Sequence, residues 1–234
     1  LVRASKIAKV RIKAPKADAE KGGWSDYSGK FDPGFQLEDF SHSALVIVCQ
    51  EFAVQSHLLA RAFMLCASQR KGDDVAKELG SAQWTGIAAL TAERLSKLLK
   101  IEGDDIQDVA KIFQIHPCFY PRTYVDLRVE ITGPQSARIS INDCPALNEG
   151  DAHSWFATLG ESTHPALDAI AGAINPRARC HPIPSQGKAR LAWELVVDPT
   201  ATPQLPPQEL NLAKISRGAS FEFEQRRTLR MRKH

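Results

Sequence analysis

The sequence predicts an α+β protein, in which a helical layer of about three helices packs on a small antiparallel sheet, with extended arms at both ends. Residues 39–115 repeat apolar side chains at helical spacing, whereas residues 124–142 contain two runs in which apolar and polar residues alternate. Residues 190–197 alternate again. A repeat of 3.6 residues is typical of helices, and a repeat of two is typical of strands with one buried face.

The helical half is expected to contain three helices. The first should begin near Ser41 or Ser43 and end near Arg70, the second should cover residues 74–100, and a short third should follow it. The first helix is apolar around most of its circumference, so we expect it at the centre of its domain. Its main stripe consists of Leu45, Val48, Cys49, Phe52, Leu59, Phe63 and Cys66.

A hairpin is predicted around a turn at residues 132–135, where Gly133 and Pro134 favour chain reversal. Both strands must turn their apolar residues toward one core, which fixes the register. Carried further along the strands, this register turns Asp143 toward the core. The predicted pairs are Ile131 with Ala137, Val129 with Ile139, Leu127 with Ile141, and Glu130 with Arg138 on the solvent face.

The rest of the chain completes the sheet and forms the arms. A helix is expected from about Ser162 to Asn175, followed by strands near residues 178–182 and 190–197. The predicted organisation is a basic and aromatic arm over residues 1–38, one α+β domain over 39–198, and a Pro-rich linker with a basic tail over 199–234. The domain would be helical over 39–115 and would contain the hairpin, a helix and a strand over 116–198.

The net charge of +3 hides an uneven distribution. Residues 1–16 hold six Lys or Arg and residues 226–234 hold five, all without an acid, which leaves 19 basic and 27 acidic residues elsewhere. The basic ends are expected to be solvated or to pack on an acidic body, and the aromatic arm is expected to cross to a partner in a homodimer. Nucleic acid is an unexpected partner, because the basic ends lack interleaved aromatic residues.

A cytoplasmic protein is expected. No run reaches the roughly 18 uncharged apolar residues that span a bilayer, and no signal peptide is evident, so a membrane is not an expected partner. Five Cys at scattered spacings do not form a disulfide framework. P-loop, Gly-x-Gly-x-x-Gly and Gly-x-Ser-x-Gly motifs are absent from the sequence, and no cofactor is predicted.

One candidate catalytic group follows the hairpin. Cys144, Asp143 and His153 are the residue types of an activated thiol, since a nucleophilic Cys needs a nearby base. The alternative is that Asp143, Cys144 and Pro145 merely end a strand.

A metal site is not predicted, although several Cys and His residues lie downstream of the helices. Their spacing matches no Cys-x-x-Cys or His-x-x-x-His pattern. Whether they converge in space is left open by the sequence; the residues are His116, Cys118, Cys144, Cys180 and His181.

Long helices, a hairpin ending in Asp143-Cys144-Pro145, a helix ending at Asn175-Pro176 and a strand with Trp193-Glu194 resemble an uncharacterised bacterial family. That family is similar to L-2-amino-thiazoline-4-carboxylic acid hydrolase-like proteins and to vinyl-reductase-type small-molecule-binding domains. The resemblance covers roughly residues 40–197 and implies a pocket between helices and sheet. Only Cys144 matches a functional-looking position, and the downstream Cys cluster of some relatives is reduced here to Cys180.

Three functions are compatible with these features. The first is a pocket for a small, largely apolar ligand, with walls from the sheet and from His57, Phe63, Trp84 and Tyr124. The second is a hydrolase-like enzyme that uses the Cys144 thiol. The third is a structural or assembly subunit that uses the basic arms.

Overall fold

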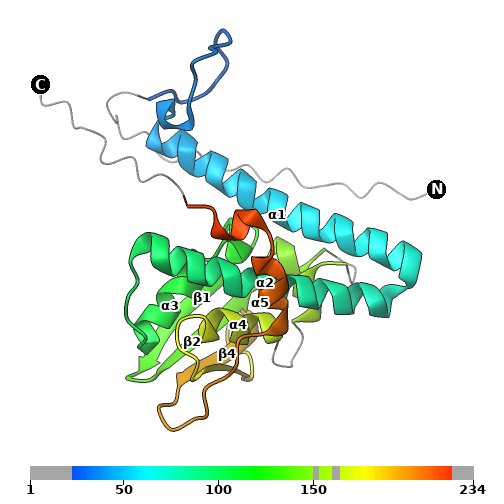
Figure 1. Ribbon diagram of the computed structural model, residues 1–234, viewed down its shortest axis with the longest axis vertical. Helices are drawn as coiled ribbons and strands as arrows, with labels where there is room; N and C mark the ends of the chain where they lie inside the picture. Colours follow the sequence, from blue (N-terminus) through cyan, green and yellow to red (C-terminus); the bar gives the residue numbers. More distant parts are fainter. Residues whose placement is uncertain (1–22, 150–152, 160–163, 223–234) are drawn as a thin grey trace, which may run out of the picture. The chain divides into compact units, whose positions relative to one another are not determined.

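The computed structural model describes residues 23–149, 153–159 and 164–222. The chain divides into two compact units, residues 1–52 and residues 53–234. In the described ranges it contains five α-helices and a four-stranded antiparallel sheet, which confirms the predicted α+β class (Figure 1). The first helix, α1, covers His42–Lys71, close to the predicted bounds.

The described part of the smaller unit is organised by its aromatic residues. Tyr27 and Phe35 stack with ring centroids 4.6 Å apart, Trp24 lies 5.3 Å from Tyr27, and Phe40 packs edge-on against Phe35 at 5.0 Å. The aromatic side chains of this Gly-rich segment therefore pack on one another. The basic stretches 1–16 and 226–234 lie outside the described residues.

The sheet of the larger unit has the strand order β1-β2-β4-β3. The strands are β1, Leu127–Gly133; β2, Ser136–Asn142; β3, Ala178–Pro182; and β4, Ala189–Val197. The hairpin register is as predicted: Leu127 pairs with Ile141, Val129 with Ile139, Ile131 with Ala137, and Glu130 with Arg138. Alternation alone sufficed here, because a slip by one residue would turn every apolar side chain to water.

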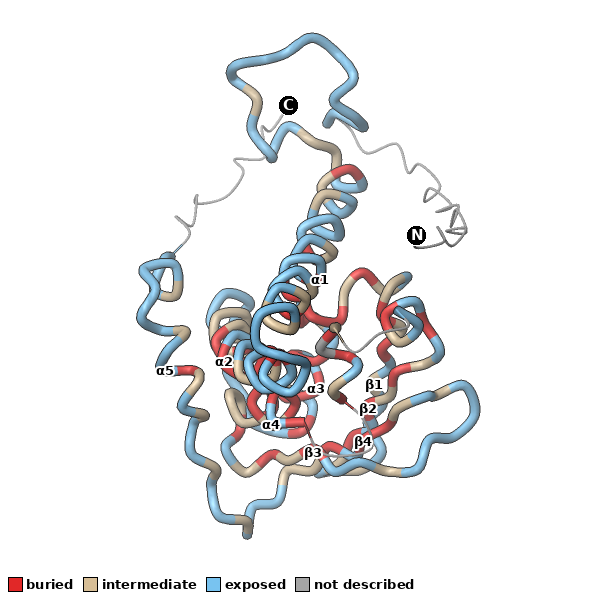
Figure 2. The backbone as a smooth tube through the Cα atoms, turned by 90° about the vertical axis from the view of Figure 1, so that its right-hand side faces the viewer, coloured by how far each residue is buried: buried red, intermediate tan, exposed pale blue. Residues whose placement is uncertain are grey.

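Helices cover one face of the sheet in layers. The helix α3, Ile106–Ile115, packs on β1, β2 and β4, and α4, Pro165–Gly172, packs on β3. The helix α2, Asp73–Leu99, packs on α4, and α5, Gln208–Lys214, packs on α2 (Figure 2). The buried core between the sheet and its helices includes Ile139, Ile141, Trp193, Leu195, Phe113 and Ile170.

Two glycines shape how the helices connect and pack. Gly72, between α1 and α2, has a φ of 90°, which L side chains rarely adopt. Gly86 of α2 faces the first turn of α5, where an added Cβ would lie 2.5 Å from the carbonyl oxygen of Glu209. The linker and tail predicted for 199–234 thus contain a helix that packs tightly on α2.

The expectation that α1 is a central helix was wrong. Within the larger unit, Leu59 is 70% exposed and Phe63 is 40% exposed, although both belong to the predicted apolar stripe. The buried face of this part of α1 instead consists of Ala53, His57, Ala60 and Met64. The long Met64 side chain reaches α2 where Gly80 leaves room for it: a Cβ at Gly80 would lie 2.9 Å from the Met64 sulfur. The periodicity identified an apolar stripe but not the side that packs.

Asp143 also differs from its prediction. The residue is exposed and does not face the core. The ladder between β2 and β4 shifts register between Ile141 and Asn142, so the alternation ends before Asp143. The neighbouring Cys144 is buried in its place.

Two of the hairpin's isoleucines, one buried and one exposed, give a matched test of the core. Ile139 is fully buried and Ile131 is 47% exposed. Ile139→Ala should lower the free energy of unfolding by about 2–5 kcal/mol, because it removes packed atoms and leaves a cavity. Ile131→Ala should cost clearly less. Urea denaturation of both variants measures the difference, and equal losses would contradict the described coverage of the sheet.

Candidate functional site

One hollow of the larger unit lies between helices. A cavity of about 540 Å³ is bounded by α1, α2, α5 and the 3₁₀ turn Pro117–Phe119 that follows α3. This volume falls within the range of about 300–1,000 Å³ that is usual for small-molecule sites. A second hollow, of about 560 Å³, lies nearer to the sheet and is lined by Gln114 of α3, by residues 127–129 of β1 and by Asp143 and Cys144.

The wall of the cavity is mostly apolar. Small residues on three helices leave the space open; they are Ala60, Ala82, Gly86 and Ala213. Larger apolar residues that are partly exposed form the rim; they are Leu59, Leu79, Ile87 and Leu212. Ser56, Gln83 and Thr91 add polar groups to the lining.

The inner part of the cavity is uncharged. Trp84, His116 and Cys118 line it and are almost completely buried. His116 donates from Nε2 to the carbonyl oxygen of Ala88 (3.1 Å) and accepts at Nδ1 from the Cys118 N–H (3.3 Å). Burial lowers the pKa of His116 to about 4 and raises the pKa of the Cys118 thiol. The imidazole and the thiol are therefore neutral near pH 7, which suits an apolar ligand.

His57 forms a second, adjoining feature. Its Nε2 lies 2.9 Å from the Tyr120 carbonyl oxygen, which can only accept, so Nε2 carries the proton and Nδ1 is an acceptor. Nδ1 is buried and has no hydrogen-bond partner among the described residues. Burial lowers the pKa of His57, against the opposing effects of the Tyr120 carbonyl and the Glu149 carboxylate. The ring lies beside Trp84, Tyr124 and Phe156, with centroids 6.1, 5.2 and 5.5 Å away.

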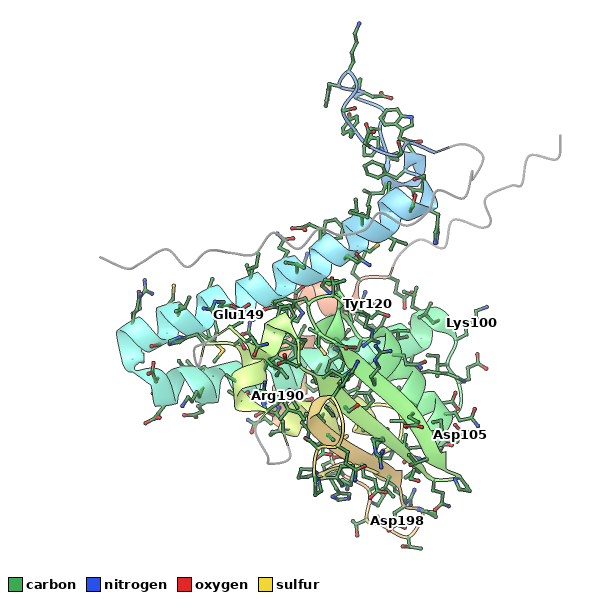
Figure 3. All side chains as sticks on the ribbon, turned by 180° about the vertical axis from the view of Figure 1, so that it is seen from behind. Lys100, Asp105, Tyr120, Glu149, Arg190 and Asp198 are labelled. Carbon is green, nitrogen blue, oxygen red and sulfur yellow. The ribbon has the colours of Figure 1, made fainter. Side chains whose placement is uncertain are left out.

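A series of polar contacts links Tyr124, Glu149 and Arg61 beside the His57 ring. The Tyr124 hydroxyl donates to Glu149 (2.6 Å), and Arg61 of α1 lies 3.8 Å from the same carboxylate. Burial, together with the Glu149 carboxylate, raises the pKa of Tyr124 well above its usual value. The Tyr120 carbonyl oxygen contacts His57, and the Glu149 carboxylate contacts Arg61, which lies one helical turn further along α1. Tyr120 and Glu149 are labelled in Figure 3. These contacts fix α1 beside the cavity.

Three of the four predicted ligand-binding residues thus come together. His57, Trp84 and Tyr124 form one cluster, and Trp84 also lines the cavity. Phe63 does not join them: it is 40% exposed and is not among the described lining residues.

The three residues of the thiol hypothesis have different partners. Asp143 accepts from Arg190 and Asn148, and Arg190 is labelled in Figure 3. His153 Nε2 lies 3.4 Å from the Asp73 carboxylate at the start of α2. Cys144 is buried and directly precedes the 3₁₀ turn Pro145–Leu147. It lies close enough to Tyr124 to contribute to the raised pKa of the Tyr124 hydroxyl. The described contacts of Asp143 and His153 are thus made with groups other than Cys144.

Two of the three His-Pro pairs have a structural role. His116 and His164 both accept, at Nδ1, a backbone N–H two residues later, and thereby cap the helical turn that begins with the proline. His181 lies exposed on β3. Within the described ranges, no group of three or more His, Cys, Asp and Glu side chains is arranged to hold a metal ion.

The contribution of α5 was missed by the sequence reasoning. Residues 199–234 were assigned to a linker and tail, and this assignment hid the role of α5 as a cavity wall. Leu210 gives the only local signal: it is buried against Ala89, Leu90 and Ala169, while Leu212 on the other side of α5 reaches the cavity.

Comparison of the chain with protein-family models, with curated proteins and with solved structures found no match. The family resemblance noted from the sequence therefore stays a prediction.

The capping histidine His116 predicts a pH dependence of stability. Its pKa of about 4 in the folded protein is below its ordinary value of 6.5, so the folded state favours the neutral ring. The stabilisation is present above pH 6.5 and is lost as the pH falls toward 4; at pH 5 the loss is about 2 kcal/mol. His116→Asn keeps a capping acceptor and should flatten the decline in unfolding free energy between pH 7 and pH 5, measured by urea denaturation. The exposed His181→Asn should keep the decline of the unsubstituted protein, and equal slopes for both variants would contradict the assignment.

Proposed function

We propose that this protein binds a small, largely apolar molecule in the cavity between α1, α2 and α5. The observation that carries this proposal is the combination of a volume of about 540 Å³ with a mostly apolar wall and an uncharged inner end. Sites for small molecules are typically concave and apolar, with a few placed polar groups.

The lining indicates the kind of ligand. The Trp84 ring offers a flat apolar surface for an aromatic or alicyclic group, and the aliphatic rim supports contact with hydrocarbon. Gln83 and Thr91 line the cavity and would orient one or two polar atoms of the ligand. An anionic ligand would be disfavoured, because Glu209 lines the cavity and the buried His116 and Cys118 supply no compensating charge.

The two alternative functions have less support. The enzyme hypothesis needs a base beside Cys144, and His153 instead approaches Asp73. The assembly hypothesis rests on basic arms that lie mostly outside the described residues. The cavity is therefore the feature on which a proposal is built, and the resemblance to small-molecule-binding domains is in line with it.

Filling the cavity should abolish binding. Ala82 lines the cavity on α2, and Ala157 is an exposed residue outside the lining. Ala82→Phe should weaken binding of the uncharged fluorescent probe N-phenyl-1-naphthylamine by at least about tenfold, or about 1.4 kcal/mol. Ala157→Phe should bind as the unsubstituted protein does. Fluorescence titration measures both, and an unchanged affinity of Ala82→Phe would contradict the cavity as the site.

Removing the Cys144 thiol separates binding from thiol catalysis. Cys144→Ala should leave the affinity for the same probe within about twofold, a change of about 0.4 kcal/mol, because Cys144 is not among the described residues that line the cavity. Thermal denaturation of the variant serves as the control for folding. A large loss of probe affinity in a folded Cys144→Ala protein would indicate that the probe binds near Cys144, at the end of β2, and not in the cavity.

A further inference from the structure

The outward face of α1 carries large apolar side chains that the described residues of the larger unit leave exposed. Leu58, Leu59 and Phe63 are 58%, 70% and 40% exposed, and Cys66 is exposed beside them. They lie opposite the face that carries His57, Ala60 and Met64, which is buried. A soluble protein seldom leaves a row of large apolar side chains on one helix in water, so this face is expected to meet a partner.

The spacing of this face is that of helices that pair. Leu45, Phe52, Leu59 and Cys66 follow one another at intervals of seven residues, and Val48 and Ala62 lie three residues after the first and third of them. Gln55 and Gln69 lie at the corresponding places after Phe52 and Cys66, so every first position but only half of the fourth positions are apolar. Apolar residues at the first and fourth positions of a seven-residue repeat form the seam of a helix pair. The partner indicated by this pattern is therefore another long helix.

The charges of α1 complement those of a second α1 that runs in the opposite direction. Between His42 and Lys71 the only acidic residue is Glu51, in the first half, whereas the basic residues Arg70 and Lys71 end the helix. Arg61, also in the second half, is paired with Glu149. An antiparallel pair brings the acidic half of each helix beside the basic half of the other, and a parallel pair would align like charges. Such a pair is also self-complementary, as a two-fold interface requires.

A lipid bilayer is the competing partner, since α1 is the one helix in the described residues that is long and apolar enough to cross a membrane. Two contacts argue against it. His57 bonds to the Tyr120 carbonyl and Arg61 pairs with Glu149, so this part of α1 is held on the α+β unit. Only residues 42–56 precede these contacts, and they form about 22 Å of helix, short of the roughly 30 Å of a hydrocarbon core.

We propose that α1 is a self-association surface, on which α1 of a second copy of this chain packs antiparallel through the face that carries Leu58, Leu59, Ala62 and Cys66. The proposal is independent of the ligand and differs from the predicted dimer through the N-terminal arm, because the contact lies on the helix.

The mass of the full-length protein in solution tests the association. Sedimentation velocity should give the mass of two chains of 25.8 kDa for the unsubstituted protein. Leu58→Glu should weaken the association at least about tenfold, because it places a charge on the apolar seam. Ile215→Glu, at another exposed apolar residue, should leave the dimer intact. A monomer at all concentrations, or an equal effect of both variants, would overturn the proposal, as would binding of the monomer to phosphatidylcholine vesicles.

Cross-linking tests the antiparallel direction. In the antiparallel pair that aligns Glu51 with Arg70, residue 55 of one copy lies level with Cys66 of the other. With Cys49 replaced by Ser, Gln55→Cys should therefore form a covalent dimer with copper phenanthroline, and the further change Cys66→Ser should prevent it. If the cross-link formed without Cys66, it would join residue 55 of one copy to residue 55 of the other. That result would overturn the antiparallel arrangement.

Discussion

The close packing around α2 is the constraint on which the larger unit depends. Of the nine buried residues of this helix, only Trp84 and Leu90 are large apolar side chains; the others are Ala, Gly or Thr. These small residues let α1, α4 and α5 approach the helix, as the contacts at Gly80, Gly86 and Ala89 show. The cost of two glycines within a helix, about 1 kcal/mol each relative to alanine, is offset by the packing that they permit.

The cavity follows from the same constraint. Met64 and Leu210 fill the space beside α2 at two points. The cavity is lined by the small side chains of Ala60 and Ala213, with Leu59 and Leu212 at its rim and Trp84 at its inner wall. His116 and Tyr124, which fix the surrounding elements, satisfy their polar atoms with the backbone or with Glu149, so that Glu209 is the charged residue among the described lining. The position of the site is thus a property of the helix packing rather than of a sequence motif.

The sequence predicted what depends on local pattern and failed where a choice between faces was needed. The hairpin register and the bounds of most elements followed from alternation, because a strand with one buried face tolerates no slip. The face of α1 that packs was not predictable, since its Ala and Met residues give a weaker signal than the Leu and Phe residues opposite. Likewise, the register shift after Ile141 depends on pairing with β4, far along the chain, so Asp143 was assigned to the wrong side. His57, Trp84 and Tyr124 were predicted as candidate ligand-binding residues. The close approach of their rings could be seen only in the folded structure.

The two faces of α1 now have a common explanation. One face binds the α+β unit through a few specific groups, His57 and Arg61, with small side chains between them. Such a face anchors the helix but buries little apolar surface, so it does not by itself account for a helix as apolar as this one. The opposite face carries the large side chains and repeats every seven residues, which is the pattern expected if its burial depends on a second helix. Leu59 belongs to both this face and the cavity rim, and a partner helix packed there would therefore also shield one side of the ligand site from water.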